Sequence, residues 1–489
     1  MKQFYFIILL FFFWACAKDR QISGNMESLP TIFPDYVNVT IPYNIAPLNF
    51  SVQSSGQPIL ALFRYGDEEF QVEGRNGEVC IPEKKWKDLL IQAKGDSIEI
   101  TIAKKEQDKW IAYSPFSMYV TKEAVDPYLA YRLIDPGYSL WNKMGIFQRN
   151  LESYEETSVY ENKITNYNCV NCHSFCQYSP DKMLFHMRAK MGGTVLIDEG
   201  EIEFLETKVE ETISALVYPY WHPSGKYIAF SVNKTTQDLH PTQRTEVYDT
   251  ASDVVVYDIE KHTILSTPLT TSRNNFETFP TFSPDGKTLF YCSAPACPMP
   301  DSIRKLSYSL CYLSFDPETG TFGNTADTLY NACTDGKSVS FPRVSPDGKF
   351  MLCTLSAYGT FPVWHKDADL YMIDLRTKRS FYPDAVNSDD TESYHSWSSN
   401  SRWIVFSSRR MDGLYTRPFL AYVAETGVIA KPFVLPQKDT GYYDLLMKSY
   451  NIPEFITGKV DNNSFKIRKK AERGGVAVKY SRRSVPKSE

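Results

Sequence analysis

Short apolar runs alternate with clusters of turn residues along most of this chain. One pattern recurs: an aromatic residue, often followed by proline, then Ser-Pro-Asp-Gly-Lys or a variant of it, then an apolar run. Proline fixes φ and glycine adopts positive φ, so each copy predicts a β-turn between two strands. The copies lie at 218–226, 279–287 and 341–349, with a degenerate copy at 394–402.

Each copy opens a longer unit. Two further strand-like runs follow in each unit; examples, one from each unit, are 253–259, 309–315, 369–375 and 419–425. Four strands per unit, repeated about every 50–60 residues, are typical of the blades of a β-propeller. A fifth copy without glycine begins at Ser174, which we align with Ser340, and its outgoing strand is expected at 183–188. We expect a sixth blade from 127–151, and we consider the segment after Pro432 as a further contributor.

These repeats resemble those of TolB-like (WD-type) β-propellers over residues 175–436. The resemblance implies an all-β fold with six blades, and we predict that the propeller spans 126–445. The alternative, an open array or two separate β domains, would expose unpaired strand edges.

The segments on either side of the propeller have different patterns. Residues 30–125 contain strand-like runs at 37–41, 59–65, 97–102 and 110–113 and one helical run at 83–93, which predict a small β-sandwich-like domain. Residues 446–489 form a C-terminal extension whose end, from Phe465, is rich in Lys and Arg. We expect this basic tail to be disordered; the alternative is docking to an anionic lipid or polysaccharide.

The first residues predict export. After Lys2 comes an unbroken apolar run from Phe4 to Ala15, which is typical of a signal peptide (1–15) and too short to span a bilayer. The stretch Phe13-Trp14-Ala15-Cys16 resembles a lipobox, so we expect lipidation of Cys16, then a linker at 16–29. The resemblance implies a lipid-anchored protein of the cell envelope, in the outer membrane. A plain signal peptide is the alternative.

Charge, cysteine count and the motifs that are missing exclude several classes of function. The formal net charge is −5, which argues against nucleic acid as a partner. Of the 10 cysteines, Cys16 belongs to the lipobox, and Cys169 and Cys172 belong to the Cys-x-x-Cys-His motif described below. Seven cysteines remain, and this odd number argues against a scaffold stapled by disulfides. We find no Gly-x-Ser-x-Gly, His-Glu-x-x-His or phosphate-loop motif.

One motif indicates chemistry. Cys169-Val170-Asn171-Cys172-His173 has the spacing of a c-type haem attachment site, in which two thiols bind the haem covalently and His173 binds the iron. The alternatives are a Cys169–Cys172 disulfide, half of a zinc site, or a thioredoxin-like redox pair.

The repeat alignment places this motif at one mouth of the propeller channel. His395, which stands where other repeats have proline, is then a candidate sixth iron ligand, and His186, Met187 and Met191 are nearer in sequence. The sequence therefore predicts a haem c lipoprotein in electron transfer or haem-linked sensing, with a redox or envelope protein as partner. The alternative is a haem-free propeller module that binds a protein or glycan and in which Cys169–Cys172 is a structural disulfide.

Overall fold

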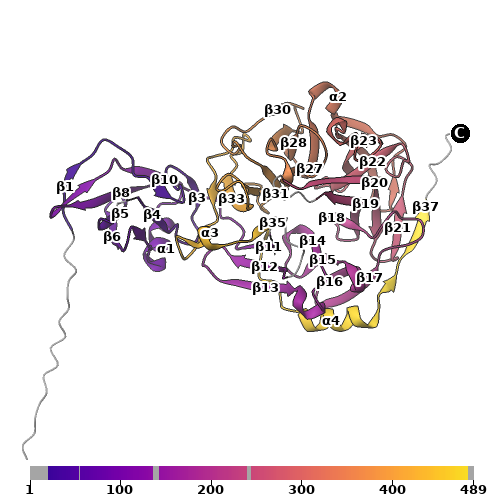
Figure 1. Cartoon of the computed structure of the whole chain (residues 1–489), viewed down its shortest axis with the longest axis horizontal. Helices are drawn as coiled ribbons and strands as arrows, with labels where there is room; N and C mark the ends of the chain where they lie inside the picture. Colours follow the sequence, from indigo (N-terminus) through magenta and orange to yellow (C-terminus); the bar gives the residue numbers. More distant parts are fainter. Residues whose placement is uncertain (1–19, 54–55, 136–142, 239–243, 483–489) are drawn as a thin grey trace, which may run out of the picture.

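The computed structural model describes residues 20–53, 56–135, 143–238 and 244–482. The chain forms a small N-terminal β domain beside a larger β-propeller (Figure 1). The predicted signal peptide (1–15) and Cys16 lie outside the described residues.

The propeller has six blades, and the innermost strands contact one another in a closed ring. In ring order these strands are β14 (Val170–Phe175), β18 (Val217–Trp221), β22 (Asn275–Phe282), β27 (Ser338–Val344), β31 (Glu392–Trp397) and β35 (Ser449–Ile456). The second strands, in the same order, are β15 (Lys182–Met187), β19 (Tyr227–Asp238), β23 (Thr288–Pro295), β28 (Phe350–Ser356), β32 (Trp403–Ser408) and β11 (Tyr128–Ile134).

The outer strands complete each blade. The third strands are β16 (Gly193–Asp198), β20 (Glu246–Asp258), β24 (Ser309–Asp316), β29 (Asp369–Asp374), β33 (Arg417–Tyr422) and β12 (Gly145–Asn150). Outside them lie β17 (Glu201–Glu206), β21 (Thr263–Ser266), β25 (Thr321–Phe322) with β26 (Asp327–Tyr330), β30 (Ser380–Phe381), β34 (Phe433–Val434) and β13 (Glu156–Glu161). The all-β propeller expected from the repeats is therefore confirmed.

The ring is closed by strands from distant parts of the chain. β35 pairs antiparallel with β11, so that Leu129 lies opposite Phe455. The blade expected from 127–151 thus receives its innermost strand from beyond residue 445, where we had predicted the propeller to end. The C-terminal extension is in this respect part of the propeller.

The Ser-Pro-Asp-Gly-Lys turns have the conformation that their residues favour. In the third copy, Gly348 adopts φ 71° and its N–H donates to the Ser345 carbonyl at 2.8 Å. The Asp347 carboxylate accepts from the Ser345 hydroxyl at 2.7 Å and from the Lys349 N–H at 3.2 Å. These bonds explain why so short a sequence fixes the hairpin in the blades that contain it.

The N-terminal domain has two sheets. The larger contains β1 (Ile22–Asn25), β9 (Lys109–Ala112), β8 (Asp96–Glu106), β10 (Phe116–Thr121), β3 (Thr40–Pro42), β5 (Ile59–Tyr65) and β6 (Glu68–Gly74). The smaller contains β2 (Ile32–Phe33), β4 (Phe50–Val52) and β7 (Glu78–Val79). Alternate residues of β8 are buried in a core shared with α1 (Glu83–Gln92) and both sheets. β1 lies within 16–29, where we had expected a linker.

The two domains are held together by a continuous apolar core and by hydrogen bonds. The Asn49 side chain donates to the Lys438 carbonyl at 3.0 Å, and the Ala46 N–H donates to the Leu151 carbonyl at 2.7 Å. Helix α3 (Tyr442–Leu445) lies at this junction (Figure 1), and α2 (Ala332–Asp335) lies in the blade of β24.

The basic tail is ordered over most of its length, contrary to our expectation of disorder from Phe465. It forms α4 (Ser464–Arg473), then β36 (Val476–Ala477) along β17 and β37 (Lys479–Arg482) along β21 (yellow in Figure 1). Ile467 is fully buried, and the two strands pair with otherwise free blade edges. Burial and backbone pairing together outweigh the charge repulsion within this segment.

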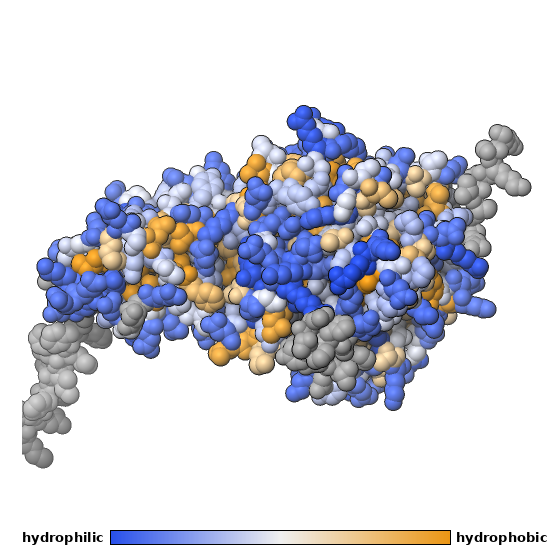
Figure 2. Space-filling model, turned by 45° about the horizontal axis from the view of Figure 1, so that its top comes forward, coloured by the Kyte–Doolittle hydropathy of each residue, from blue (hydrophilic) through white to orange (hydrophobic). Residues whose placement is uncertain are grey.

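Within the described residues, none of the helices has the length and apolar character needed to cross a membrane. Hydrophilic residues cover most of the face seen in Figure 2, and hydrophobic residues are gathered there in small patches.

Candidate ligand-binding site at the mouth of the central channel

Each innermost strand contains one residue in the left-handed conformation. The six are Cys172, Tyr218, Phe279, Phe341, Tyr394 and Ile452, with φ between 44° and 53°. At each of them the ladder to the next strand shifts register, as in a β-bulge. Left-handed residues other than glycine are uncommon, so their recurrence in all six blades marks a regular feature of the fold.

The aromatic members of this set close the channel. The ring of Phe279 lies 4.1 Å from that of Phe341 and 4.8 Å from that of Tyr218, and Phe341 lies 4.5 Å from Tyr394. Rings from four blades can touch only near the propeller axis, so these residues form an aromatic plug. The plug separates one mouth of the channel from the other.

The haem motif lies beside this plug. Its alignment with the other repeats differs by three residues from the alignment that we predicted. The ladders align Asn171, not Ser174, with Ser340, since each is the last paired residue before the bulge. The missing glycine and the different turn after β14 hid this offset. Cys172 therefore belongs to the set of bulged residues, and His173 stands where the third repeat has Pro342.

The motif residues do not converge. Cys172 is 2% exposed beside the plug, and burial raises the pKa of its thiol. His173 is 3% exposed and points toward the neighbouring blade, with Nε2 at 3.7 Å from Glu454 Oε2. Burial lowers the pKa of His173 to about 3, and neither ring nitrogen has a hydrogen-bond partner among the described residues.

Haem attachment requires both thiols and the imidazole on one porphyrin. As folded, Cys172 and His173 point in different directions and are both buried, so this strand does not fit the group. Cys169 is half-buried, and all nine cysteines of the described residues are free thiols. The disulfide of the alternative reading is therefore not formed in the structure.

The candidate sixth ligands are not brought together with His173. His395 does stand in place of proline, but its Nε2 donates to the Leu352 carbonyl at 2.8 Å between two blades. His186 is buried with Nδ1 at 3.3 Å from the Thr194 hydroxyl. Met187 is fully buried in an apolar cluster on which Met191 packs.

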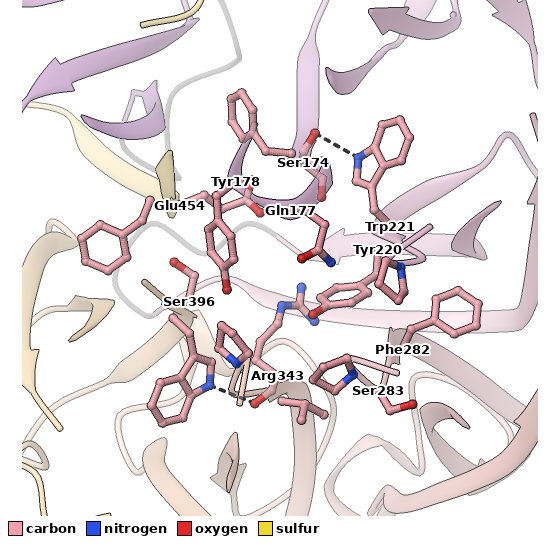
Figure 3. A pocket seen from close by; sticks show the side chains of 17 residues that line it. Ser174, Gln177, Tyr178, Tyr220, Trp221, Phe282, Ser283, Arg343, Ser396 and Glu454 are labelled. Atoms are coloured by element: carbon pink, nitrogen blue, oxygen red, sulfur yellow. Dashed lines mark hydrogen bonds between the residues drawn. The ribbon is translucent and has the colours of Figure 1, made fainter. Parts of the chain in front are cut away.

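A cavity of about 160 Å³ lies at the mouth of the channel that the hairpin turns surround (Figure 3). Two positions after the bulge, five of the six innermost strands contribute a residue to its lining. These are Ser174, Tyr220, Arg343, Ser396 and Glu454. Gln177 and Tyr178 from the turn after β14 and three turn prolines complete the polar and apolar rim.

The electrostatics of this mouth depend on Arg343 and Glu454, its one cation and one acid. Burial lowers the pKa of Arg343, while Tyr220 and Glu454 oppose that change, and a guanidinium stays charged in proteins. Burial raises the pKa of Glu454 to about 8 against the opposing effect of Arg343. Burial therefore disfavours the charged form of this carboxyl, whereas the guanidinium beside it keeps its charge.

Sequence reasoning missed this site because each blade supplies one residue. The signal was present in the repeat alignment: Arg343 stands in the third copy where the others have Tyr220, Thr281 and Ser396. A charged residue at a position that faces the channel in every repeat would have indicated it.

Comparison with known proteins finds similarity in fold alone. No family model matches the chain, and no curated protein matches it. A structure described as a 6-phosphogluconolactonase from Bacteroides fragilis aligns with 64% of this chain and 97% of its own, at 10% identity and TM-score 0.30. Prolyl oligopeptidase B from Galerina marginata aligns with 62% of this chain and 45% of its own, at 10% identity and TM-score 0.36. An endo-arabinanase from Bacillus licheniformis aligns with 62% of this chain and 92% of its own, at 9% identity and TM-score 0.31.

Proposed function

We propose that this protein is a binding module, in which a TolB-like propeller captures a protein or glycan at the channel mouth lined by Arg343. The observation that carries the proposal is a half-buried cation, Arg343, which lines the cavity at the channel mouth and has no ion-pair partner among the described residues. Charges withdrawn from water are ordinarily paired, so an unpaired one at an open mouth suits a ligand.

The composition of the mouth supports the same function. Tyr220, Trp221, Trp397 and Arg343 line it, and Tyr, Trp and Arg are the residues that dominate binding energy at interfaces. The plug prevents passage through the propeller, so a ligand enters and leaves by the same side. This arrangement suits capture rather than transport.

The cellular setting belongs to the proposal. With lipidation of Cys16, the anchor would directly precede the N-terminal domain, which packs on the propeller. The protein would then be anchored in the outer membrane, and its channel mouth would be accessible to a partner in the cell envelope.

Site-specific photo-crosslinking in cells tests this function. A photoreactive residue replaces Gln177, which is exposed at the mouth, and in a matched control it replaces Thr377, which is exposed at a turn on an outer strand. The expected result is one discrete adduct from position 177 alone, whose digestion by protease or glycosidase identifies its class. Equal labelling from both positions, or none, would refute the proposal.

Haem c remains a second candidate, with a role in electron transfer or haem-linked sensing. It is favoured by the two unpartnered ring nitrogens of His173 beside the free thiols of Cys169 and Cys172. It would require β14 to leave its present conformation. Haem staining after denaturing electrophoresis, in a host that attaches haem c, tests it beside Cys172→Ser: stain lost in the variant supports haem, and a colourless wild type refutes it.

A further inference from the structure

The mouth of the channel is specific enough to indicate which chemical group it binds. Arg343 is the one cation among its lining residues. Its Nη1 donates to the Pro342 carbonyl at 2.8 Å, and it forms no ion pair with a described residue. The other N–H donors of the guanidinium are thus available to an anionic ligand.

The guanidinium is held in place before any ligand arrives. The Trp397 indole donates to the Arg343 carbonyl at 3.1 Å, which ties two neighbouring blades together at this residue. The guanidinium carbon lies 5.0 Å from the centre of the Tyr220 ring and 5.7 Å from that of Phe341. Figure 3 shows it between Tyr220 and the side chains of Gln177 and Tyr178. A fixed, planar fork of donors matches the geometry of a carboxylate.

The charge of the site favours a monoanion. One guanidinium balances one carboxylate, whereas a phosphate dianion would leave a negative charge in a partly buried cavity. Glu454 lines the same mouth but forms no ion pair with Arg343, so the guanidinium is left for the carboxylate of a ligand.

The rim favours a peptide over a glycan. Pro223, Pro284 and Pro346 surround the mouth together with aromatic side chains. The Ser396 hydroxyl already donates to the Pro453 carbonyl at 2.8 Å, and the Ser283 hydroxyl to Asp285. Few polar side chains are left for the many hydroxyls of a sugar. The cavity of about 160 Å³ is also smaller than the roughly 300–1,000 Å³ of a typical small-molecule site, and it suits one side chain or chain end.

We infer that the channel mouth binds a peptide carboxylate, with Arg343 as the residue that grips it. This inference rests on the proposed binding function and names the chemistry of its ligand. The carboxylate is either the end of a peptide chain or an Asp or Glu side chain, and the two sources share this chemistry.

The test measures the binding of small probes to the full chain. The readout is tryptophan fluorescence, because two tryptophans line the mouth. N-acetylphenylalanine carries a terminal carboxylate, N-acetylphenylalaninamide lacks it, and N-acetylglutamate α-amide carries only a side-chain carboxylate. Galacturonic acid represents an acidic glycan. We expect at least one of the two peptide acids to bind about tenfold more tightly than the amide, since hydrogen bonds to charged groups are the stronger ones.

Variants assign the effect to one residue. Arg343→Gln should remove the preference for acid over amide, and Arg343→Lys should retain part of it because the charge remains without the fork. Arg376→Gln, an exposed arginine in a turn of an outer strand, is the matched control and should leave the preference unchanged. The comparison of acid with amide on the wild type needs no variant, so it holds even if Arg343→Gln folds poorly.

The outcomes separate this inference from the proposed function. Equal binding of both acids and the amide would overturn the carboxylate, while an adduct at position 177 would still support the binding function. Tighter binding of galacturonic acid than of either peptide acid would overturn the peptide in favour of a glycan. Failure of the crosslink and of all probes would overturn both.

Discussion

Replacing Glu454 by Gln should change how the stability of the protein depends on pH. The carboxyl lies in the channel mouth near Arg343 and His173, and burial raises its pKa from an ordinary 4.5 to about 8. The unfolded chain loses this proton above pH 4.5, whereas the folded chain keeps it until about pH 8. The free energy of unfolding therefore falls as pH rises between these values and receives no further contribution from Glu454 above pH 8.

The magnitude follows from the same values. Each pH unit between 4.5 and 7 costs about 1.4 kcal/mol, so a fully buried carboxyl would lower the stability at pH 7 by ~3 kcal/mol. Because the side chain is 22% exposed, solvent reduces this to ~2 kcal/mol. Gln has a similar shape and does not ionise, so the variant should gain stability over the wild type as pH rises from 5 to 8.

Urea denaturation followed by tryptophan fluorescence, at several pH values from 5 to 9, measures this difference. Other buried acids contribute equally to both proteins and cancel. Glu425→Gln is the control, since its side chain is 82% exposed. A difference between wild type and Glu454→Gln that stays constant from pH 5 to 8 would refute the reasoning, because it would show that Glu454 is already ionised in the folded protein at pH 5.

Three further predictions concern the plug, the closing strand and the thiols. Phe279→Ala removes a ring that is 1% exposed and should lower the free energy of unfolding by about 3–5 kcal/mol in urea denaturation; a loss below about 1 kcal/mol would contradict the plug. A chain that ends at Leu446 lacks β35 and should be degraded in limited proteolysis, whereas one that ends at 460 keeps the ring and should resist; equal resistance would contradict closure by β35. Iodoacetamide should modify half-buried Cys169 before buried Cys172, whose pKa is raised, as mass spectrometry of the native protein can show; equal rates would contradict the buried position of Cys172.

The sequence was most informative where structure is local. The Ser-Pro-Asp-Gly-Lys turns could be predicted because each one is fixed by its own residues, such as Gly348 and Asp347. The helix expected at 83–93 and the strand expected at 59–65 are likewise present as α1 and β5. In α1 the buried residues Trp86, Leu89 and Leu90 recur at the helical period, whereas β5 begins with a short continuous apolar run.

Long-range features could not be predicted in the same way. β35 is not followed by a turn motif, because its partner β11 lies far earlier in the chain rather than immediately after it. The mouth residues are one per blade, and only their positions in the ring bring Arg343 and Glu454 into one cavity. The direction of the Cys172 side chain depends on a bulge with φ 53°, which no residue type in the motif indicates.

The pairing of β11 with β35 also determines the order in which the protein can be completed. The strands of the first blade are made early, but the strand that fits between them and the axis is not made until roughly 300 residues later. At roughly 5–20 residues per second, synthesis leaves that edge open for roughly 15 seconds to a minute. An unpaired edge is a template for aggregation, so the nascent chain exposes an aggregation-prone edge during this interval. The native ring is therefore a product of the whole polypeptide, and a ribosome that stalls anywhere before β35 leaves an incomplete propeller.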